Sequence, residues 1–310
     1  MQLKSKDLLG MWQLDRDEIE LILNTASSMK QALLSGYKKT THLAGKSVVT
    51  LFYENSTRTR LSFEMAAKFM GASTGNISAS GSSVSKGESL LDTAITIDHM
   101  ATDFIVMRHS AAGAPHFLAN RLDASVINAG DGMNEHPTQS LLDLFTMREQ
   151  LNRLEGLKVA IVGDISHSRV ARSNIWALQK FGSEVRVAGP GSMMPPELAR
   201  SGAIVCSSVA EACRDADVVM GLRLQMERMD SGLFPSIAEY AKFYGISHEI
   251  LDCAKPEAIV MHPGPYNHGL EMPSPIRYGD QSKIDEQVTN GVACRMAVLY
   301  LLNVKRNSMK

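Results

Sequence analysis

The sequence is short of the features that mark several specialised protein classes. It has four cysteines in 310 residues, none in CxxC spacing, so we expect reduced thiols rather than a zinc site or a disulfide framework. Its 32 basic residues face 33 acidic ones, which leaves no basic excess for nucleic-acid binding. No apolar run reaches the ~18 residues that span a membrane, and residues 1–10 contain no apolar signal core. We therefore expect a cytoplasmic protein with no nucleic-acid or membrane partner.

Two common cofactor loops are also absent. The segment Val162-Gly163-Asp164-Ile165-Ser166 follows an expected strand but lacks the GxGxxG pattern of dinucleotide sites. Lys86 lies in a Ser/Gly-rich loop, residues 78–86, but it precedes Gly87, whereas a P-loop needs glycine before its lysine. Nicotinamide cofactors and ATP are therefore disfavoured, and we expect neither a cofactor nor a metal.

Short apolar runs alternate with helical periodicity in two blocks, and this alternation predicts the fold. A length of 310 residues also suits two domains. We predict an α/β protein with two doubly wound parallel-sheet domains joined by bridging helices. The first domain takes residues 1–149 and 290–310, because a late helix over 282–302 is expected to return to it, and the second takes 150–289. The expected strands are 47–53, 103–107, 125–129, 158–162, 185–188, 203–206, 218–220 and 258–261.

Local signals set several helix boundaries. Asp15 and Glu18 have the spacing of a capping box, which predicts the start of a helix that ends near Gly36. Gly71 is a plausible stop for the helix that follows the first strand. We also expect helices over 88–100 and 169–181, and a turn at 130–132.

The most informative stretch is Tyr53-Glu54-Asn55-Ser56-Thr57-Arg58-Thr59-Arg60. It places hydroxyls and a guanidinium where a strand gives way to a helix, next to unpaired N–H groups and the positive end of the helix dipole. These groups together suit a phosphate. An N-cap serine with solvated arginines is an equally open interpretation of this stretch alone.

Further polar groups follow the other expected strands. They are Arg108, His136 with Gln139, Arg169, Arg223 with Gln225, and His262-Pro263-Gly264-Pro265. In open parallel sheets, ligands bind beyond the carboxyl ends of the strands. The shared placement of these groups at that edge is the main argument from the residues for a binding site.

Each group has a functional and a structural interpretation. His136 and Gln139 share one helix face and suit a carbonyl oxygen and its NH2 group, or are a capping histidine and a solvated amide. Arg223 and Gln225 alternate after a strand, and an arginine fork suits a carboxylate, although an edge charge fits equally. Arg108 is either an arm for an anion or one half of a surface ion pair. Lys86 either reaches an anionic site or is solvated.

The motifs resemble those of a known family. Ser56-Thr57-Arg58-Thr59-Arg60, His136-Pro137-Thr138-Gln139 and His262-Pro263-Gly264-Pro265 closely resemble catalytic chains of the aspartate carbamoyltransferase family, and the resemblance runs over about residues 3–304. The first motif is shared with ornithine carbamoyltransferases. His-Pro-Gly-Pro in place of His-Cys-Leu-Pro, together with Lys86-Gly87-Glu88 and residues 163–174, is similar to the aspartate type.

The resemblance implies a reaction and a set of site residues. The reaction is transfer of the carbamoyl group of carbamoyl phosphate to L-aspartate, giving N-carbamoyl-L-aspartate and phosphate, an early step of pyrimidine biosynthesis. The resemblance implies that the phosphate is held by Ser56, Thr57, Arg58, Thr59 and Arg108. It implies that the carbamoyl group is held by Thr59, Arg108, His136 and Gln139, and the aspartate carboxylates by Arg169, Arg223 and Gln225. Lys86 is expected to bridge both substrates, and the backbone at Pro263 and Gly264 to orient the carbamoyl nitrogen and the attacking amine.

The same resemblance implies an assembly. Ser82 and Lys86 are expected to enter from a neighbouring subunit, which implies a homotrimer with shared active sites. It assigns catalytic roles to Arg58, Thr59, Lys86, Arg108 and His136. It leaves open a regulatory chain or a dihydroorotase as a further partner.

Two departures and two alternatives accompany this hypothesis. Asn55 stands where many members have proline, and His268 where many have arginine, but neither is expected to touch substrate. One alternative is a carbamoyltransferase with another amino-acid acceptor. The other is a non-catalytic, phosphate-binding regulatory subunit, because fold alone does not give function.

Overall fold

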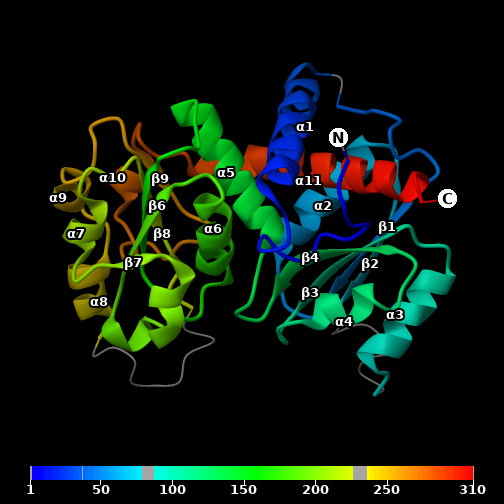
Figure 1. The fold of residues 1–310 in the computed structure, drawn as a ribbon, viewed down its shortest axis with the longest axis horizontal. Helices are drawn as coiled ribbons and strands as arrows, with labels where there is room; N and C mark the ends of the chain where they lie inside the picture. Colours follow the sequence, from blue (N-terminus) through cyan, green and yellow to red (C-terminus); the bar gives the residue numbers. More distant parts are fainter. Residues whose placement is uncertain (1, 37, 79–86, 226–235, 310) are drawn as a thin grey trace. The chain divides into compact units, whose positions relative to one another are not determined.

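The computed structural model describes residues 2–36, 38–78, 87–225 and 236–309 (Figure 1). The chain divides into two compact units, which we call unit 1 (up to residue 142, and 289 onward) and unit 2 (143–288). The boundaries between them fall inside two helices, α5 (Pro137–Leu151) and α11 (Ile284–Asn307). Both units contain a parallel sheet with helices, which confirms the predicted α/β fold class.

Unit 1 is built on a four-stranded parallel sheet in the order β2-β1-β3-β4. Its strands are β1 (Ser47–Phe52), β2 (Ser73–Ser78), β3 (Phe104–His109) and β4 (Ser125–Asp131). Its other helices are α1 (Arg16–Leu34), α2 (Thr57–Phe69), α3 (Leu90–His99) and α4 (Ala114–Ala119). The chain starts at a central strand, moves to one side for β2, and then continues on the other side of β1.

Helices cover both faces of this sheet, and the strands β1, β3 and β4 are largely buried on both sides. One face, with Leu51 and Ile105, packs against Ala94 of α3 and Leu118 of α4. The opposite face carries Phe104, whose ring lies 5.9 Å from the guanidinium carbon of Arg306 on α11. The end of α11 therefore packs on the sheet of unit 1.

Unit 2 is built on a five-stranded parallel sheet in the order β7-β6-β5-β8-β9. Its strands are β5 (Lys158–Val162), β6 (Glu184–Ala188), β7 (Ile204–Val205), β8 (Val218–Gly221) and β9 (Ile259–Met261). Its helices are α6 (Arg169–Gln179), η3 (Gly191–Met193), η4 (Pro196–Ser201), α7 (Val209–Cys213), α8 (Ile237–Tyr244), α9 (His248–Leu251) and α10 (Ser274–Arg277).

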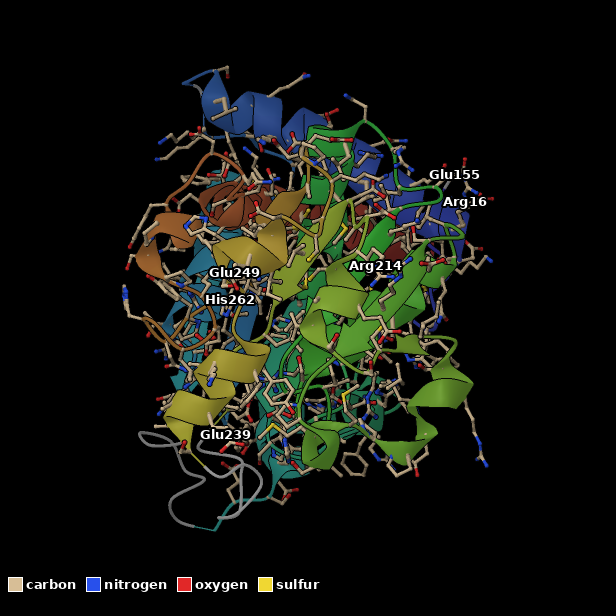
Figure 2. All side chains as sticks on the ribbon, turned by 90° about the vertical axis from the view of Figure 1, so that its left-hand side faces the viewer. Arg16, Glu155, Arg214, Glu239, Glu249 and His262 are labelled. Carbon is tan, nitrogen blue, oxygen red and sulfur yellow. The ribbon has the colours of Figure 1, made fainter. Side chains whose placement is uncertain are left out.

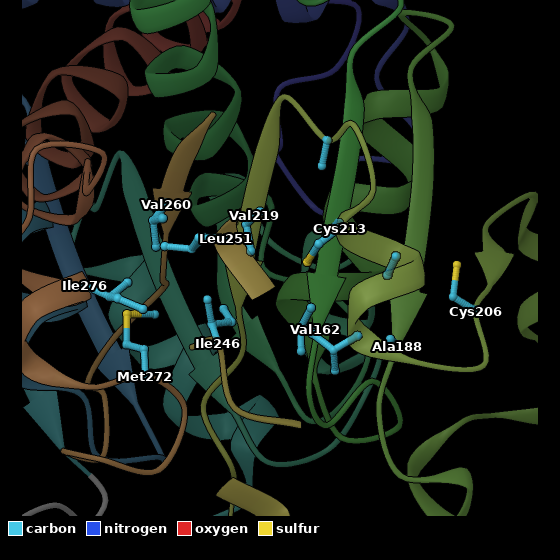
Figure 3. Close-up of a cluster of buried hydrophobic side chains, with 14 of the residues drawn as sticks. Val162, Ala188, Cys206, Cys213, Val219, Ile246, Leu251, Val260, Met272 and Ile276 are labelled. Atoms are coloured by element: carbon cyan, nitrogen blue, oxygen red, sulfur yellow. The ribbon is translucent and has the colours of Figure 1, made fainter. Parts of the chain in front are cut away.

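On one side of its sheet, unit 2 buries a cluster of hydrophobic side chains (Figure 3). Val162, Val219 and Val260 belong to one buried cluster with residues of α7, α9 and α10. The alternate residue Met220 faces the other way, where its sulfur lies 3.4 Å from the side-chain nitrogen of Asn174 on α6. Both layers are apolar, as a parallel sheet buried on both faces requires.

Most predicted boundaries agree with the structure. The Asp15–Glu18 capping box is present, and Gly36 and Gly71 both have positive φ just beyond the ends of α1 and α2. Several predictions were wrong in detail, and strand β2 (Ser73–Ser78) was not predicted. The helix expected from residue 88 begins at Leu90, capped by Ser89. The turn expected at 130–132 is still strand as far as Asp131, and the helix expected to reach 181 ends at Gln179.

The remaining features limit the kinds of site in the described residues. Within these ranges no helix is long and apolar enough to cross a membrane. Among the same residues, no group of histidine, cysteine and acidic side chains is placed to hold a metal ion. None of the four cysteines forms a disulfide, and three of them are buried. Burial raises the pKa of the Cys213 thiol to about 12.

Candidate active site

Several of the predicted site residues follow the strands at which the chain reverses direction across each sheet. In unit 1 the reversal lies between β1 and β3, and in unit 2 between β5 and β8. Ser56 to Thr59 follow β1, and Arg108 lies at the end of β3. Arg169 follows β5, and Arg223 follows β8. In doubly wound sheets this reversal opens a crevice at the carboxyl ends of the strands, where ligands bind.

The helix N-termini that carry predicted site residues differ in charge from the other helix N-termini. Among described helices of at least eight residues, α1, α3, α8 and α11 carry an acidic residue in the first turn. The helices α2, α5 and α6 carry none. Instead, the first turns of α2 and α6 contain Arg58 and Arg169. A cation there opposes the helix dipole, and an anionic ligand relieves the conflict.

Ser56 occupies the N-cap position of α2 but makes no side-chain capping bond. By contrast, Ser89, Ser168 and Ser236 each accept a bond from the backbone of their own helix. The structural interpretation of Ser56 as an ordinary cap is therefore not supported. Thr57 and Arg58 are exposed, while Thr59 is buried.

Arg108 is held in place by two groups of unit 1. Its Nε lies 3.3 Å from Oε2 of Glu54, and its Nη1 donates to the carbonyl of Ala129 at 3.3 Å. Next to it, burial lowers the pKa of His109, whose Nδ1 accepts from the backbone of Ala111 at 2.8 Å. The arginine is thus oriented at the strand end rather than solvated.

His136 and Gln139 lie at the start of α5, where Pro137 is the first helical residue as expected. The carbonyl of His136 accepts from the backbone N–H groups of Gln139 and Ser140 at 3.0 and 3.2 Å. Both predicted side chains are buried, with exposed fractions of 5% for His136 and 9% for Gln139. The expectation of a solvated glutamine is therefore wrong.

In unit 2 a buried carboxylate shapes the loop before Arg169. Asp164 has no exposed surface and accepts from both the backbone and Nδ1 of His167, at 3.1 and 2.8 Å. The carbonyl of His167 in turn accepts from Nε2 of Gln225 at 3.3 Å. This contact brings Gln225 to the loop that leads into α6, whose first residue, Arg169, is buried.

Arg223 and Gln225 lie on one side of their segment, as their alternation predicts. Both are half-buried, whereas Leu224 between them is buried on the other side. The backbone N–H of Leu224 donates to Oε1 of Glu271 at 3.0 Å. Glu271 also accepts from the side chain of Asn267 at 2.8 Å, and burial raises the pKa of its carboxyl group.

The His262 turn after β9 is fixed at both ends (Figure 2 labels His262). The N–H of His262 donates to the Gln287 side chain at 3.0 Å, and the N–H of Gly264 donates to Nδ1 of His262 at 2.9 Å. Pro263 has no N–H, so the Pro263–Gly264 backbone offers carbonyl oxygens. Such acceptors suit an N–H-bearing ligand group.

Sequence reasoning missed the acidic partners of these residues. Glu54, Asp164 and Glu271 each hold a site segment in place. The position of Glu54 could have predicted its role. It lies between the first strand and Ser56, where an arginine from the neighbouring strand needs a counter-charge. Two predicted residues, Ser82 and Lys86, fall outside the described residues.

The fold and these residues define a class. It is a parallel α/β protein of two units, in which arginines follow the strands where the chain reverses direction across each sheet. Two sequence profiles identify the family within this class. The profile of the aspartate/ornithine carbamoyltransferase carbamoyl-P binding domain matches residues 6–149, and that of the Asp/Orn binding domain matches residues 155–302. The chain belongs to the aspartate/ornithine carbamoyltransferase family.

Individual relatives agree with this family. The chain is 64% identical over 302 residues to the aspartate carbamoyltransferase catalytic subunit of Ruminiclostridium cellulolyticum, covering 97% of this chain and 96% of the relative. The corresponding subunit of Acetivibrio thermocellus is 62% identical, with 97% of each chain covered.

Solved structures agree as well. Aspartate transcarbamoylase of Trypanosoma cruzi, in complex with carbamoyl phosphate and aspartate, matches with a TM-score of 0.85 and 31% identity, over 96% of this chain and 95% of that one. Ornithine carbamoyltransferase of Thermus thermophilus also matches with a TM-score of 0.85, at 26% identity, over 97% of this chain and 99% of that one.

Proposed function

We propose that this protein transfers the carbamoyl group of carbamoyl phosphate to the amino group of L-aspartate, giving N-carbamoyl-L-aspartate and phosphate for pyrimidine biosynthesis. One observation carries the proposal. The three helices that begin with or next to predicted site residues, α2, α5 and α6, lack first-turn acids, and two of them present arginine there. Both substrates are anions, and the relatives named above carry this activity in their names.

The roles follow from the chemistry of each group. Unit 1 binds carbamoyl phosphate, with Ser56, Thr57, Arg58, Thr59 and Arg108 at the phosphate, and Thr59, Arg108, His136 and Gln139 at the carbamoyl group. Unit 2 binds aspartate through Arg169, Arg223 and Gln225, because a guanidinium fork matches a carboxylate. The carbonyls of Pro263 and Gly264 orient the carbamoyl nitrogen and the attacking amine, and Lys86 contacts both substrates.

The reaction needs positioning and electrostatic stabilisation. The aspartate amine attacks the carbamoyl carbon, and negative charge develops on the carbamoyl oxygen. Thr59, Arg108 and His136 donate to that oxygen, and such donors each contribute about 10²–10³ in rate. The C–O bond to phosphate then breaks, and the leaving phosphate takes the proton from the amine. Holding two anions in line for attack accounts for much of the remaining acceleration.

The test is formation of N-carbamoyl-aspartate by the purified chain from carbamoyl phosphate and L-aspartate, with L-ornithine as the alternative acceptor and a chelator present. We expect turnover with aspartate only. Turnover with ornithine instead would overturn the acceptor assignment and the roles of Arg223 and Gln225. Carbamoyl phosphate binding without turnover would favour a non-catalytic, phosphate-binding subunit.

We also propose a cytoplasmic homotrimer in which Ser82 and Lys86 act in the neighbouring subunit's site, on the strength of the family membership. Sedimentation equilibrium measures the mass of the assembly. Mixing an inactive Lys86→Gln variant with an inactive Arg108→Ala variant should restore activity if sites are shared, because some mixed sites then contain neither substitution. Absence of any restored activity in verified mixed trimers would contradict sharing. The same membership supports a regulatory chain or dihydroorotase as a candidate partner.

A further inference from the structure

The first residues of the chain form an extended segment, not predicted from the sequence, beside the four-stranded sheet of unit 1. Residues 6–12, here called the N-terminal strap, run along the outer edge of β4. The N–H of Leu8 donates to Val126 at 3.0 Å, and the N–H of Asn128 donates to the Leu8 carbonyl at 2.8 Å. The Asp7 carboxylate accepts from the Val126 N–H at 2.7 Å. The strap is therefore anchored to the sheet by the backbone of β4.

The strap ends on a buried carboxylate. Oε2 of Glu135 accepts from the backbone N–H of Met11 at 2.7 Å, and only 1% of the surface of Glu135 is exposed. The chain passes so close that a Cβ at Gly10 would overlap Oε1 of Glu135. No positive φ is present at Gly10, so the close approach to this carboxylate is what requires glycine there.

A second buried carboxylate fixes the backbone of Glu135. Oδ1 of Asp131 accepts from the Glu135 N–H at 3.0 Å and from the side chain of Asn128 at 2.8 Å. Its Oδ2 accepts from the Gly113 N–H at 2.8 Å and from the side chain of Asn134 at 3.0 Å. Asp131 is fully buried, so these donors make the hydrogen bonds that water would make to an exposed carboxylate.

His136 follows Glu135 directly and immediately precedes Pro137, the first residue of α5. Its backbone is thus fixed from one side by the helix and from the other by Glu135. If the strap moves, the Glu135 carboxylate loses the Met11 donor, and losing a hydrogen bond to a buried charged group is costly. The residue must then shift toward water, and the adjacent His136 shifts with it.

We propose that the N-terminal strap positions His136, with Glu135 as the residue that transmits the position. The inference rests on the proposed function, in which His136 donates to the carbamoyl oxygen. Glu135 and Gly10 are positioning residues, since neither is assigned a contact with substrate. The phosphate-binding residues lie on α2 and β3, so the strap should affect turnover without affecting phosphate binding.

The experiment is a double-mutant cycle on the full chain with Gly10→Ala, Glu135→Ala and the double variant. Gly191→Ala is the matched control, because nothing lies near a Cβ there and its φ is ordinary. We expect Gly10→Ala to lower kcat about 10- to 100-fold, as a displacement of about 1 Å can, with the Kd for inorganic phosphate unchanged. In the Glu135→Ala background, Gly10→Ala should have little further effect.

Several results would overturn the proposal. One is a Gly10→Ala enzyme with the same kcat as Gly191→Ala. Another is an equal loss of kcat with and without the Glu135 carboxylate, which would mean that the two residues act independently. Should Gly10→Ala not fold, Glu135→Ala alone carries the test, and a parallel loss of kcat and phosphate binding would count against positioning.

A readout without turnover separates this inference from the proposed function. The ring signal of His136 in a histidine-labelled protein, assigned with His136→Gln, should shift in Gly10→Ala and stay in place in Gly191→Ala. If the wild-type chain transfers no carbamoyl group, the proposed function fails, but this signal still tests the strap. An unchanged signal in folded Gly10→Ala refutes the strap even if the enzyme is active.

Discussion

At the scale of single residues, carboxylates hold most of the proposed site, and two of the three are buried. Glu54 pairs with Arg108, Asp164 fixes the loop before Arg169, and Glu271 holds the backbone between Arg223 and Gln225. A carboxylate that accepts several N–H groups fixes loop geometry, because each donor loses stabilisation if the loop moves. The cationic groups proposed to bind substrate are therefore placed before substrate arrives.

Arg108→Lys tests this arrangement at the proposed phosphate and carbamoyl edge. Lysine keeps the charge but loses the planar fork that spans Glu54 and the Ala129 carbonyl. We expect kcat/KM for carbamoyl phosphate to fall about 10²–10³-fold, the usual loss for one oxyanion donor. The control is Arg121→Lys, since Arg121 is exposed and its guanidinium contacts the carbonyl and the ring of nearby Phe117. Equal activity of the two variants would remove Arg108 from the site.

A second residue-scale prediction concerns stability and pH. Although burial of Asp217 favours its neutral form, the Lys158 backbone N–H and the Lys255 and Arg153 side chains outweigh burial and lower its pKa. Its contribution to stability is therefore fully present above its unfolded pKa, about 4, and is lost as the pH falls through its lower folded-state pKa.

Asp217→Asn should accordingly lower the free energy of unfolding at pH 7 by about 1.5–3 kcal/mol, the range for hydrogen bonds to charged groups. Urea unfolding from pH 7 down to pH 3 checks this, and the difference from wild type should shrink only at the acid end. Asp215→Asn is the neighbouring control, because Asp215 has φ 54°, a conformation that asparagine also tolerates. A difference that already vanishes near pH 6 would contradict the lowered pKa.

At the scale of elements, local patterns predicted the strands other than β2 (Ser73–Ser78), whose residues are mostly polar, but not the contacts that hold the proposed site. Apolar runs and the capping box are local, so β1, β5 and α1 lie where their residues indicate. The strap was missed because its donors are backbone groups and its acceptor, Glu135, is 124 residues away from Met11. Every residue except proline has a backbone N–H, so the sequence does not indicate which of these groups bonds to a distant side chain.

We predict that the N-terminus of α2 is less stable than it could be because its residues are suited to binding an anion. Ser56→Asp places a carboxylate at the N-cap, where it can accept from the helix and interact favourably with the dipole. We expect the free energy of unfolding to rise by about 0.5–1 kcal/mol. Phosphate affinity should fall, because the added charge occupies the proposed phosphate position.

The matched control is Ser247→Asp at the N-cap of α9, where the serine already caps the helix through Ile250. It should leave phosphate affinity unchanged. Thermal unfolding and phosphate titration of both variants give the two quantities. A Ser56→Asp protein that binds phosphate as tightly as wild type would place the phosphate elsewhere.

At the scale of the whole molecule, the two sheets carry different ligand chemistry. Unit 1 carries hydroxyls, Arg108 and the buried His136, while unit 2 carries Arg169 and Arg223 with the amide of Gln225. The apolar pattern predicted two such sheets. It did not predict the place where each sheet reverses, because strand order depends on which strands pair, and pairing is not encoded in any one strand.

This division predicts how ligands protect the chain from hydrogen exchange. Inorganic phosphate should slow exchange at α2 and at the end of β3 in unit 1, and leave the loop before α6 in unit 2 unaffected. N-(phosphonacetyl)-L-aspartic acid, which combines a phosphonate with aspartate and is bound in one of the Trypanosoma cruzi structures, should slow exchange in both units. The reason is that a ligand protects the elements it contacts and stabilises the bound state by mass action.

Substitutions in unit 2 test whether the protection from hydrogen exchange comes from the proposed contacts with aspartate. Arg223→Lys should weaken protection of unit 2 by the phosphonate compound, because lysine cannot form the bidentate pair with a carboxylate, while phosphate still protects unit 1. Arg277→Lys serves as the control, since Arg277 lies in unit 2 and pairs with the exposed Asp285. If the phosphonate compound protected only unit 1 in the wild-type chain, the assignment of aspartate binding to unit 2 would be wrong, because its aspartate part would then have no contact there.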